Sequence, residues 1–208
     1  MAPYPKATGG RAIHREGPRL EYVIICHHPY QEKKCTLHPL RGRPDIKFRT
    51  RYETGGFRSG ALFLFPGGEV LTEDLAGEIL GGARRLVKER DPVEERGRMT
   101  GEGGGGRGVG GEEHGGDGGP PAIQVILIDG RWGKVGGLAA SLGGLRKISL
   151  EGYRTGAVRR RPPPEGGLAS VEALFVTSLM FGVPDPSLLE GYHFRDRFLE
   201  LNGLERCG

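Results

Sequence analysis

Residues 123–132 read IQVILIDGRW, and this stretch decides the fold. Its first six residues are almost all apolar, are rich in β-branched side chains and show little alternation. That pattern is typical of a strand buried on both faces of a sheet. The run ends at a carboxylate, Asp129, which is followed at once by Gly, Arg and Trp. If the sheet is parallel, this polar exit is a candidate site, because ligands bind beyond the carboxyl ends of the strands in open α/β sheets.

The rest of the chain supplies partners for this strand. Short apolar runs predict further strands over residues 22–26, 61–65 and 146–150. Capping residues and helical spacing predict helices over residues 72–87, 170–181 and 186–204. Strands that alternate with helices predict an α/β fold with a mostly parallel sheet and helices on both faces.

Glycine marks the domain organisation. Of the 39 glycines, a large share falls in residues 97–119, a low-complexity segment that cannot bury enough apolar surface to become ordered. A phosphate-binding loop would need a preceding strand, a following helix and a terminal Lys-Ser/Thr, which this segment lacks. We therefore expect a disordered insertion near residues 96–120. Residues 1–19 are also expected to be disordered, so one domain spans residues 20–207.

Composition sets broad limits on function. The chain has 208 residues, a formal net charge of +4 and a pI of about 9.1, which suits a polyanionic partner without requiring one. Three scattered cysteines are typical of a reducing compartment. No apolar run approaches the roughly 20 residues of a spanning helix, and the N-terminus has no secretory signal. We expect an intracellular protein, nuclear or cytoplasmic, with no membrane partner; the oligomeric state is not predicted.

Polar groups gather at three predicted strand exits. The first strand leads into CHHPYQEKK, the second into FPGGE and the third into DGRW. Because the carboxyl ends of parallel strands meet at one edge of a sheet, these His, Glu, Pro-Gly and Asp residues are expected to converge. Another question is whether zinc binds at Cys26, His27, His28, Cys35 and His38, but the chain has no C-x-x-C pair, so we expect no metal site.

Four segments taken in order carry a family resemblance: VIICHHPYQEKK, ALFLFPGGEV, VILIDGRWGKV and RRRPPPEGGLASVEAL. They resemble the DTW-domain family, which is marked by a His-Pro-x-Glu loop, a Pro-Gly loop, an Asp-x-Thr-Trp turn and a late Ser/Thr-x-Glu-Ala helix start. The resemblance covers most of residues 20–205 apart from the glycine-rich segment. Arg131 stands where the family has Thr, and Glu32 lies three residues after Pro29 rather than two.

This resemblance implies a SPOUT-like fold and a tRNA-uridine aminocarboxypropyltransferase activity. Such an enzyme transfers the 3-amino-3-carboxypropyl group of S-adenosyl-L-methionine to N3 of a uridine in tRNA and releases methylthioadenosine. The implied partners are tRNA and S-adenosylmethionine, the latter as co-substrate. Two alternatives remain: a catalytically degenerate DTW-like RNA-binding protein, and methyl transfer on a related scaffold.

The resemblance also implies roles for individual residues. Asp129 and Trp132 are the candidate catalytic residues, with Asp129 removing or orienting the proton on uridine N3. Asp129 could instead cap a helix, and Trp132 could be a core aromatic. The candidate cofactor-binding residues are Pro66, Gly67, Gly130, Ser170 and Glu172. The candidate substrate-binding residues are His28, Glu32, Arg131 and Arg160. Glu172 could instead complete a capping box, Gly130 could belong to an ordinary turn, and the loop side chains could be surface groups.

Overall fold

The sheet is the centre of the fold, and its five strands are all parallel. The computed structural model describes residues 17–27, 35–90, 122–158 and 167–204. The strand order is β2-β1-β4-β3-β5, which places β4 in the middle of the sheet. The strands are β1 (Arg19–Cys26), β2 (Ile46–Thr50), β3 (Leu62–Val70), β4 (Ala122–Asp129) and β5 (Arg146–Ser149).

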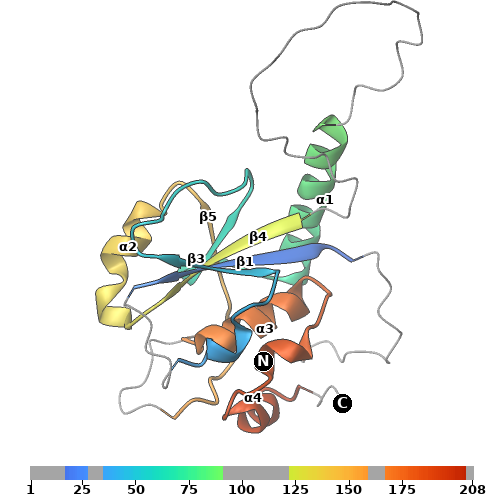
Figure 1. Ribbon diagram of the computed structural model, residues 1–208. Coiled ribbons are helices and arrows are strands. Elements are labelled where there is room, and N and C mark those ends of the chain that lie inside the picture. The colour runs from blue at the N-terminus through green and yellow to red at the C-terminus, as the bar shows by residue number, and fades with distance from the viewer. Residues whose placement is uncertain (1–16, 28–34, 91–121, 159–166, 205–208) are drawn as a thin grey trace, which may run out of the picture.

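Helices cover both faces of this sheet (Figure 1). The α-helices are α1 (Glu73–Arg90), α2 (Gly136–Ser141), α3 (Ser170–Met180) and α4 (Arg195–Leu201). Three short 3-10 helices are η2 (His38–Leu40), η3 (Trp132–Lys134) and η4 (Pro186–Leu189). The prediction of an α/β fold with a parallel sheet and helices on both faces is therefore confirmed.

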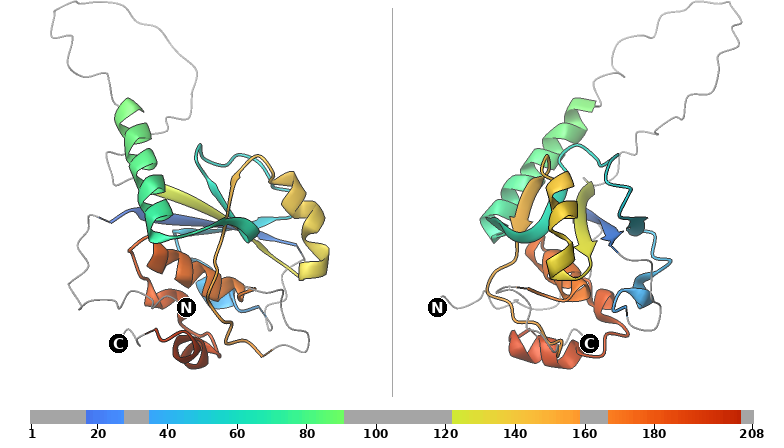
Figure 2. Two further views of the ribbon diagram at one scale, coloured as in Figure 1. Left: turned by 180° about the vertical axis from the view of Figure 1, so that it is seen from behind. Right: turned by 90° about the vertical axis from the view of Figure 1, so that its left-hand side faces the viewer.

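The larger core lies on the face covered by α1, α3 and α4, and the smaller one on the face covered by α2. Alternate residues of β1 point to the two sides: Tyr22 and Ile24 enter the larger core, whereas Val23 and Ile25 enter the smaller one. Burial of both faces explains why the strands read as continuous apolar runs. Figure 2 shows α1 extending beyond the strands of the sheet.

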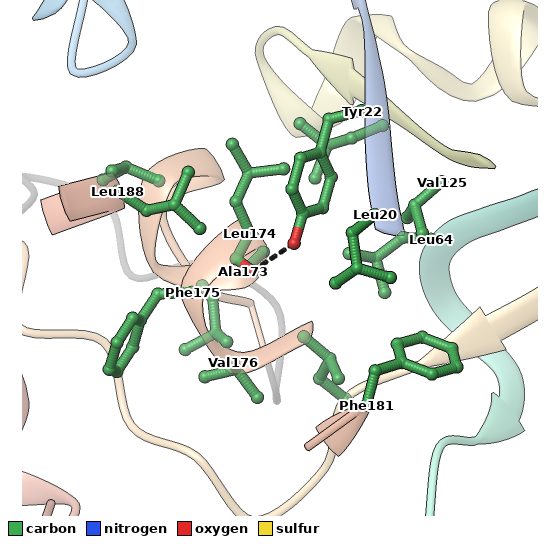
Figure 3. Packing of buried hydrophobic residues seen from close by; sticks show 14 of the residues in the cluster. Leu20, Tyr22, Leu64, Val125, Ala173, Leu174, Phe175, Val176, Phe181 and Leu188 are labelled. Carbon is green, nitrogen blue, oxygen red and sulfur yellow. Dashed lines mark hydrogen bonds between the residues drawn. The ribbon is translucent and has the colours of Figure 1, made fainter. Parts of the chain in front are cut away.

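The hydroxyl group of Tyr22 is buried in the larger core and has a hydrogen-bond partner there. The Tyr22 hydroxyl donates to the backbone oxygen of Leu174, at 3.2 Å, and so joins β1 to α3 (Figure 3). Burial raises the pKa of Tyr22, so this hydroxyl keeps its proton at neutral pH. The hydrogen bond lets a large side chain fill the space between sheet and helix without leaving a buried donor unpaired.

The predicted last helix, residues 186–204, is wrong as one element. The chain forms η4, then a break, then α4. Gly191 in the break has a φ of +70°, and a Cβ there would lie 3.0 Å from Cγ of Pro39. The apolar spacing that suggested one helix reflects burial alone, because Leu188 and Phe198 on either side of the break are both fully buried.

Among the strands and α-helices of the described residues, β2 and α2 have no counterpart in the sequence prediction. β2 reads IKFRT, in which charged residues alternate with apolar ones at the edge of the sheet. α2 begins with two glycines, which are poor helix formers. The predicted disordered segments fall largely on residues 1–16 and 91–121, which lie outside the described residues, although β1 already begins at Arg19.

Candidate functional site

A cavity opens at the carboxyl ends of β3, β4 and β5, next to the start of α3. Its empty space, with the open solvent at its mouth included, is about 840 Å³. β3 leads to α1 on one face of the sheet, whereas β4 leads through η3 to α2 on the other. The cavity thus lies where the chain leaves two neighbouring strands in opposite directions, the usual place for a ligand in an open α/β sheet.

The walls are mostly apolar, with a few polar groups among them. The lining residues are Leu64, Phe65, Pro66, Gly67, Leu127, Ile128, Asp129, Gly130, Val135, Ser149, Leu150, Glu151, Leu168, Ser170 and Ala173. Five of the residues predicted to form the site are therefore brought together: Pro66, Gly67, Asp129, Gly130 and Ser170.

A bulge in β3 shapes one wall of the cavity. β3 pairs with β4 only as far as Leu64, and its pairing with β5 then shifts from Leu64 to Glu69, both opposite Ile148. The intervening residues, FPGG, leave the ladder, and the first three of them line the cavity. Gly67 within the bulge has a φ of +72°, in the region that favours glycine.

The bulge is held against β5 by close packing. A Cβ on Gly68 would lie 2.7 Å from backbone atoms of Lys147 and Ile148, so only glycine fits there. The Ser149 hydroxyl donates to the Gly68 backbone oxygen at 3.0 Å. The Lys147 ammonium lies 5.2 Å from the centre of the Phe65 ring, which places a positive charge beside this wall.

Asp129 and Ser170 form the polar centre of the site. Asp129 is the last residue of β4 and Ser170 the first of α3, and the Ser170 hydroxyl donates to Oδ1 of Asp129 at 2.7 Å. Among the described residues this is the one hydrogen bond that the Asp129 side chain accepts. Asp129 therefore does not cap the following helix; its second oxygen can accept a proton or a hydrogen bond from a ligand.

Gly130 is required by packing around the strand exit. A Cβ at this position would come within 2.8 Å of both Cβ of His27 and Cγ1 of Val135. The His27 backbone N–H also donates to the Asp129 backbone oxygen, at 2.9 Å, so the exits of β1 and β4 are fixed side by side. This close fit, rather than a turn with positive φ, accounts for the glycine.

Glu172 has a structural role and does not line the cavity. Its carboxylate is fully buried and accepts hydrogen bonds from the Ala169 and Gly156 backbone N–H groups and from the Tyr192 hydroxyl, at 2.7 to 2.8 Å. The bond to Ala169, three residues earlier, is the glutamate half of a capping box. Glu172 thus joins the start of α3 to the segment after β5 and to Tyr192, as its capping alternative predicts.

Of the remaining predicted site residues, Arg131 is the one whose side chain the structure describes. Arg131 is exposed, and it does not line the cavity. The backbone of Trp132 starts η3 immediately after Arg131. His28, Glu32 and Arg160 lie outside the described residues.

Glu151 is a cavity residue that the sequence reasoning missed. It follows β5, exposed at the mouth of the cavity and contributing a second carboxylate to the lining. The signal was available, because residues 146–150 are predicted as a strand and the rule that points to strand exits applies equally to this one. Ser149, whose hydroxyl donates to the Gly68 backbone oxygen, also lines the cavity, but it lies inside the predicted strand, so that rule does not point to it.

Two cysteines lie close enough to Asp129 for its charge to act on them. Burial, and then the negative charge of Asp129, raise the pKa of the Cys26 thiol to about 11. Burial also raises the pKa of Cys35. Both thiols are therefore protonated at neutral pH and are weak nucleophiles. Within the described ranges, no three His, Cys, Asp or Glu side chains gather as a metal ion would need.

The site can bind a ligand that is largely apolar and carries positive charge. Two carboxylates, Asp129 and Glu151, face a space walled by leucine, valine, phenylalanine and proline side chains. Asp129 is half-buried, so its carboxylate interacts with a cation or an N–H group more strongly than it would in open water, because less water competes. Among the described helices, none is both long and apolar enough to cross a membrane. Comparison of the chain with family models, curated proteins and solved structures found no match.

Proposed function

We propose that this chain is a SPOUT-like tRNA-uridine aminocarboxypropyltransferase that uses S-adenosylmethionine. The observation that carries the proposal is the contact between Asp129 and Ser170 in a cavity that also includes Pro66 and Gly67. These residues come from three of the four segments that resemble the DTW-domain family. Their meeting at the carboxyl ends of the strands is what a shared active site requires.

The cavity residues fit the co-substrate in shape and charge. The bulge at Pro66 and Gly67, with Leu150 and Leu168, provides an apolar surface for the flat adenine ring. The two carboxylates, Asp129 and Glu151, complement the positive charges of the sulfonium and the amino group. Bound S-adenosylmethionine supplies an electrophilic carbon next to a positively charged sulfur, which leaves as the neutral thioether methylthioadenosine.

Asp129 has the chemistry that the uridine substrate needs. The N3 nitrogen of uridine is a poor nucleophile while it carries its proton, so a carboxylate within hydrogen-bond reach assists by removing that proton. As the N3–C bond forms and the C–S bond breaks, the N3 proton passes to the carboxylate. The hydrogen bond from Ser170 orients Oδ1 and leaves the other oxygen for this transfer.

The apolar walls exclude water from the reacting groups and fix their alignment. An in-line displacement requires nitrogen, carbon and sulfur to be nearly collinear, and holding them so contributes much of the rate enhancement. Arg131, where the related family has Thr, is exposed and does not line the cavity, so its bulk does not fill the reaction space. This favours the active enzyme over an RNA-binding protein without turnover.

The direct test is to incubate the purified chain with unmodified tRNA and S-adenosylmethionine and to analyse the digested RNA by mass spectrometry. We expect a uridine with one added aminocarboxypropyl group and an equal amount of methylthioadenosine. Binding of tRNA with no adduct would support the degenerate alternative. A methyl adduct with S-adenosylhomocysteine would instead indicate methyl transfer.

A further inference from the structure

A basic surface on the edge strand β2 stands apart from the cavity. Residues 41–58 contain six basic and two acidic side chains, a net charge of +4. The whole chain has 30 basic and 26 acidic residues, so the other residues together are neutral. The segment around β2 is therefore strongly basic for its length.

Two of these basic residues have structural roles. Arg43 makes two hydrogen bonds to the Asp45 carboxylate, at 2.8 and 3.0 Å, and a further one to Asp185. Arg58 pairs with the buried Glu21 at 3.1 Å. Lys47, Arg49 and Arg51, with Tyr52, form what we call the β2 surface.

The strand register shows how the β2 surface is oriented. Lys47 pairs with Val23 and Arg49 with Ile25, and both partners point into the smaller core, so the two cations lie on the α2 face of the edge strand. The Arg49 guanidinium lies 5.1 Å from the centre of the Phe57 ring and donates to the Gly55 backbone oxygen at 2.6 Å. Its position is thus fixed by the loop that follows β2.

A tight turn presents the other two residues. The Glu53 N–H donates to the Thr50 backbone oxygen at 3.0 Å, and the Glu53 carboxylate accepts from the Thr50 N–H and hydroxyl. Arg51 and Tyr52 occupy the two corners of this turn. The Arg51 guanidinium lies 4.8 Å from the centre of the Tyr52 ring, and Tyr52 is 79% exposed. An exposed aromatic ring beside a guanidinium is a surface on which a nucleobase can stack.

The turn lies at the same end of the sheet as the cavity. Thr50 pairs with Cys26, and Cys26 pairs with Asp129, so the three residues stand in a row across β2, β1 and β4. Two strand spacings separate Thr50 from Asp129 by about 10 Å. That distance equals about three nucleotides of a stacked single strand.

We infer that the β2 surface docks the RNA substrate, with Tyr52 stacking on a base near the modified uridine and Lys47, Arg49 and Arg51 contacting phosphates. This inference rests on the proposed function for the identity of the target uridine, whereas the RNA-binding step can be measured separately. Charge complementarity selects a polyanion. The exposed tyrosine beside arginine selects an RNA with unpaired bases over an anionic membrane surface.

The test is the binding of a labelled, unmodified tRNA transcript by fluorescence anisotropy at several salt concentrations. The double variant Lys47→Ala with Arg51→Ala should bind more weakly and lower the slope of log affinity against log salt by about 1.5. Tyr52→Ala should weaken tRNA binding by about fivefold or more, with little change in the salt slope. Tyr52→Phe keeps the aromatic ring and should restore the affinity. All these residues are at least partly exposed, so circular dichroism should show unchanged folding.

The matched control is Arg84→Ala with Arg85→Ala on α1, which removes the same charge. α1 leads from the end of β3 back toward the start of β4, so these two exposed arginines lie away from the cavity. The control should bind tRNA like the wild type. Equal weakening by both pairs, or an unchanged salt slope in the β2 pair, would overturn the inference. So would preference of the wild type for phosphatidylserine vesicles over tRNA.

The two proposals fail in different ways. If the wild type binds tRNA through the β2 surface but forms no uridine adduct, the docking surface stands and the transferase activity does not. If the adduct forms and the β2 variants match the wild type in affinity and salt dependence, the transferase stands and the docking surface is wrong.

Discussion

At the scale of single residues, the Asp129 carboxylate determines whether the cavity is catalytic. We expect Asp129→Asn to lower the rate of adduct formation by about 100-fold or more, because an amide cannot accept the N3 proton. S-adenosylmethionine should still stabilise the variant. The rate is measured by mass spectrometry at saturating tRNA, with Asp74→Asn on the exposed start of α1 as the control. An unchanged rate would remove Asp129 from the mechanism.

Cys26 can report on the charge of Asp129. In a chain with Cys35→Ser and Cys207→Ser, we expect slow alkylation of Cys26 at pH 7.5 and a rate that rises toward the thiol pKa of about 11. Asp129→Asn should lower that pKa and speed alkylation below pH 11, because the carboxylate charge raises it. A rate profile that is the same in both proteins would show that the carboxylate and the thiol do not interact.

The raised pKa of Cys26 also has a consequence for stability. The folded chain holds the thiol proton more tightly than the unfolded chain, whose thiol has the ordinary pKa of 9.0. The resulting stabilisation is complete below pH 9 and is lost as the pH rises toward 11. Cys26→Ser should therefore flatten the fall in unfolding free energy over this pH window, measured by urea denaturation.

Glu172 should behave as a structural residue. Glu172→Ala leaves the Ala169 N–H, the Gly156 N–H and the Tyr192 hydroxyl without their acceptor in a buried place. We expect the free energy of unfolding to fall by about 3 kcal/mol, measured by urea denaturation. Glu190→Ala, at an exposed position, is the control and should change little. A stable variant that fails only to bind S-adenosylmethionine would restore the cofactor-binding role.

At the scale of elements, the β3 bulge shapes the cavity. The need for Gly68 in this bulge can be tested against a control glycine where the same change should have the opposite effect on stability. Gly68→Ala should destabilise the protein by about 1 to 3 kcal/mol, because the added methyl would meet the backbone of β5. Gly77→Ala makes the same chemical change in α1, where no atom lies within 4 Å of the new methyl. It should stabilise the protein by about 0.5 to 1 kcal/mol. Thermal unfolding should therefore show a lower melting temperature for Gly68→Ala and a higher one for Gly77→Ala.

The elements also show what could be predicted from sequence and what could not. The inner strands were predictable because β1, β3 and β4 each contain a short apolar run. β2 was missed because an edge strand is only half buried and Lys47 and Arg49 break its apolar pattern. The same exposure that hides β2 from prediction makes it available to a partner.

The site was predictable only in part, because the sequence pattern is local whereas the site is formed by residues far apart in the chain. Asp129, Pro66 and Gly67 follow the apolar runs that predict strands, so the rule for parallel sheets places them at one edge. Ser170 lies 41 residues after Asp129 in the chain, and nothing in local pattern says that the two side chains touch. Glu172 was assigned to the site although it does not line the cavity. In the sequence, a carboxylate at a helix start has the same pattern whether it binds a ligand or a backbone N–H.

At the scale of the whole molecule, ligand binding should be visible as stability. A ligand present at 100 times its dissociation constant stabilises the folded state by about 2.7 kcal/mol. For a chain of this size, that corresponds to a rise in melting temperature of about 5 to 10 °C. We expect S-adenosylmethionine to give such a rise and adenosine alone a smaller one, measured by differential scanning fluorimetry. No rise at millimolar ligand would contradict the proposed co-substrate.

The strand order has a consequence for how the chain is made. β4 is the central strand, yet it is the fourth to leave the ribosome, and its first contact across the sheet pairs Ala122 with Arg19. Until residue 129 has emerged, β3 has neither of its two neighbours, β4 and β5. Synthesis therefore leaves one edge of β1 and both edges of β3 open to wrong pairing, and the cavity can form only after α3 has followed.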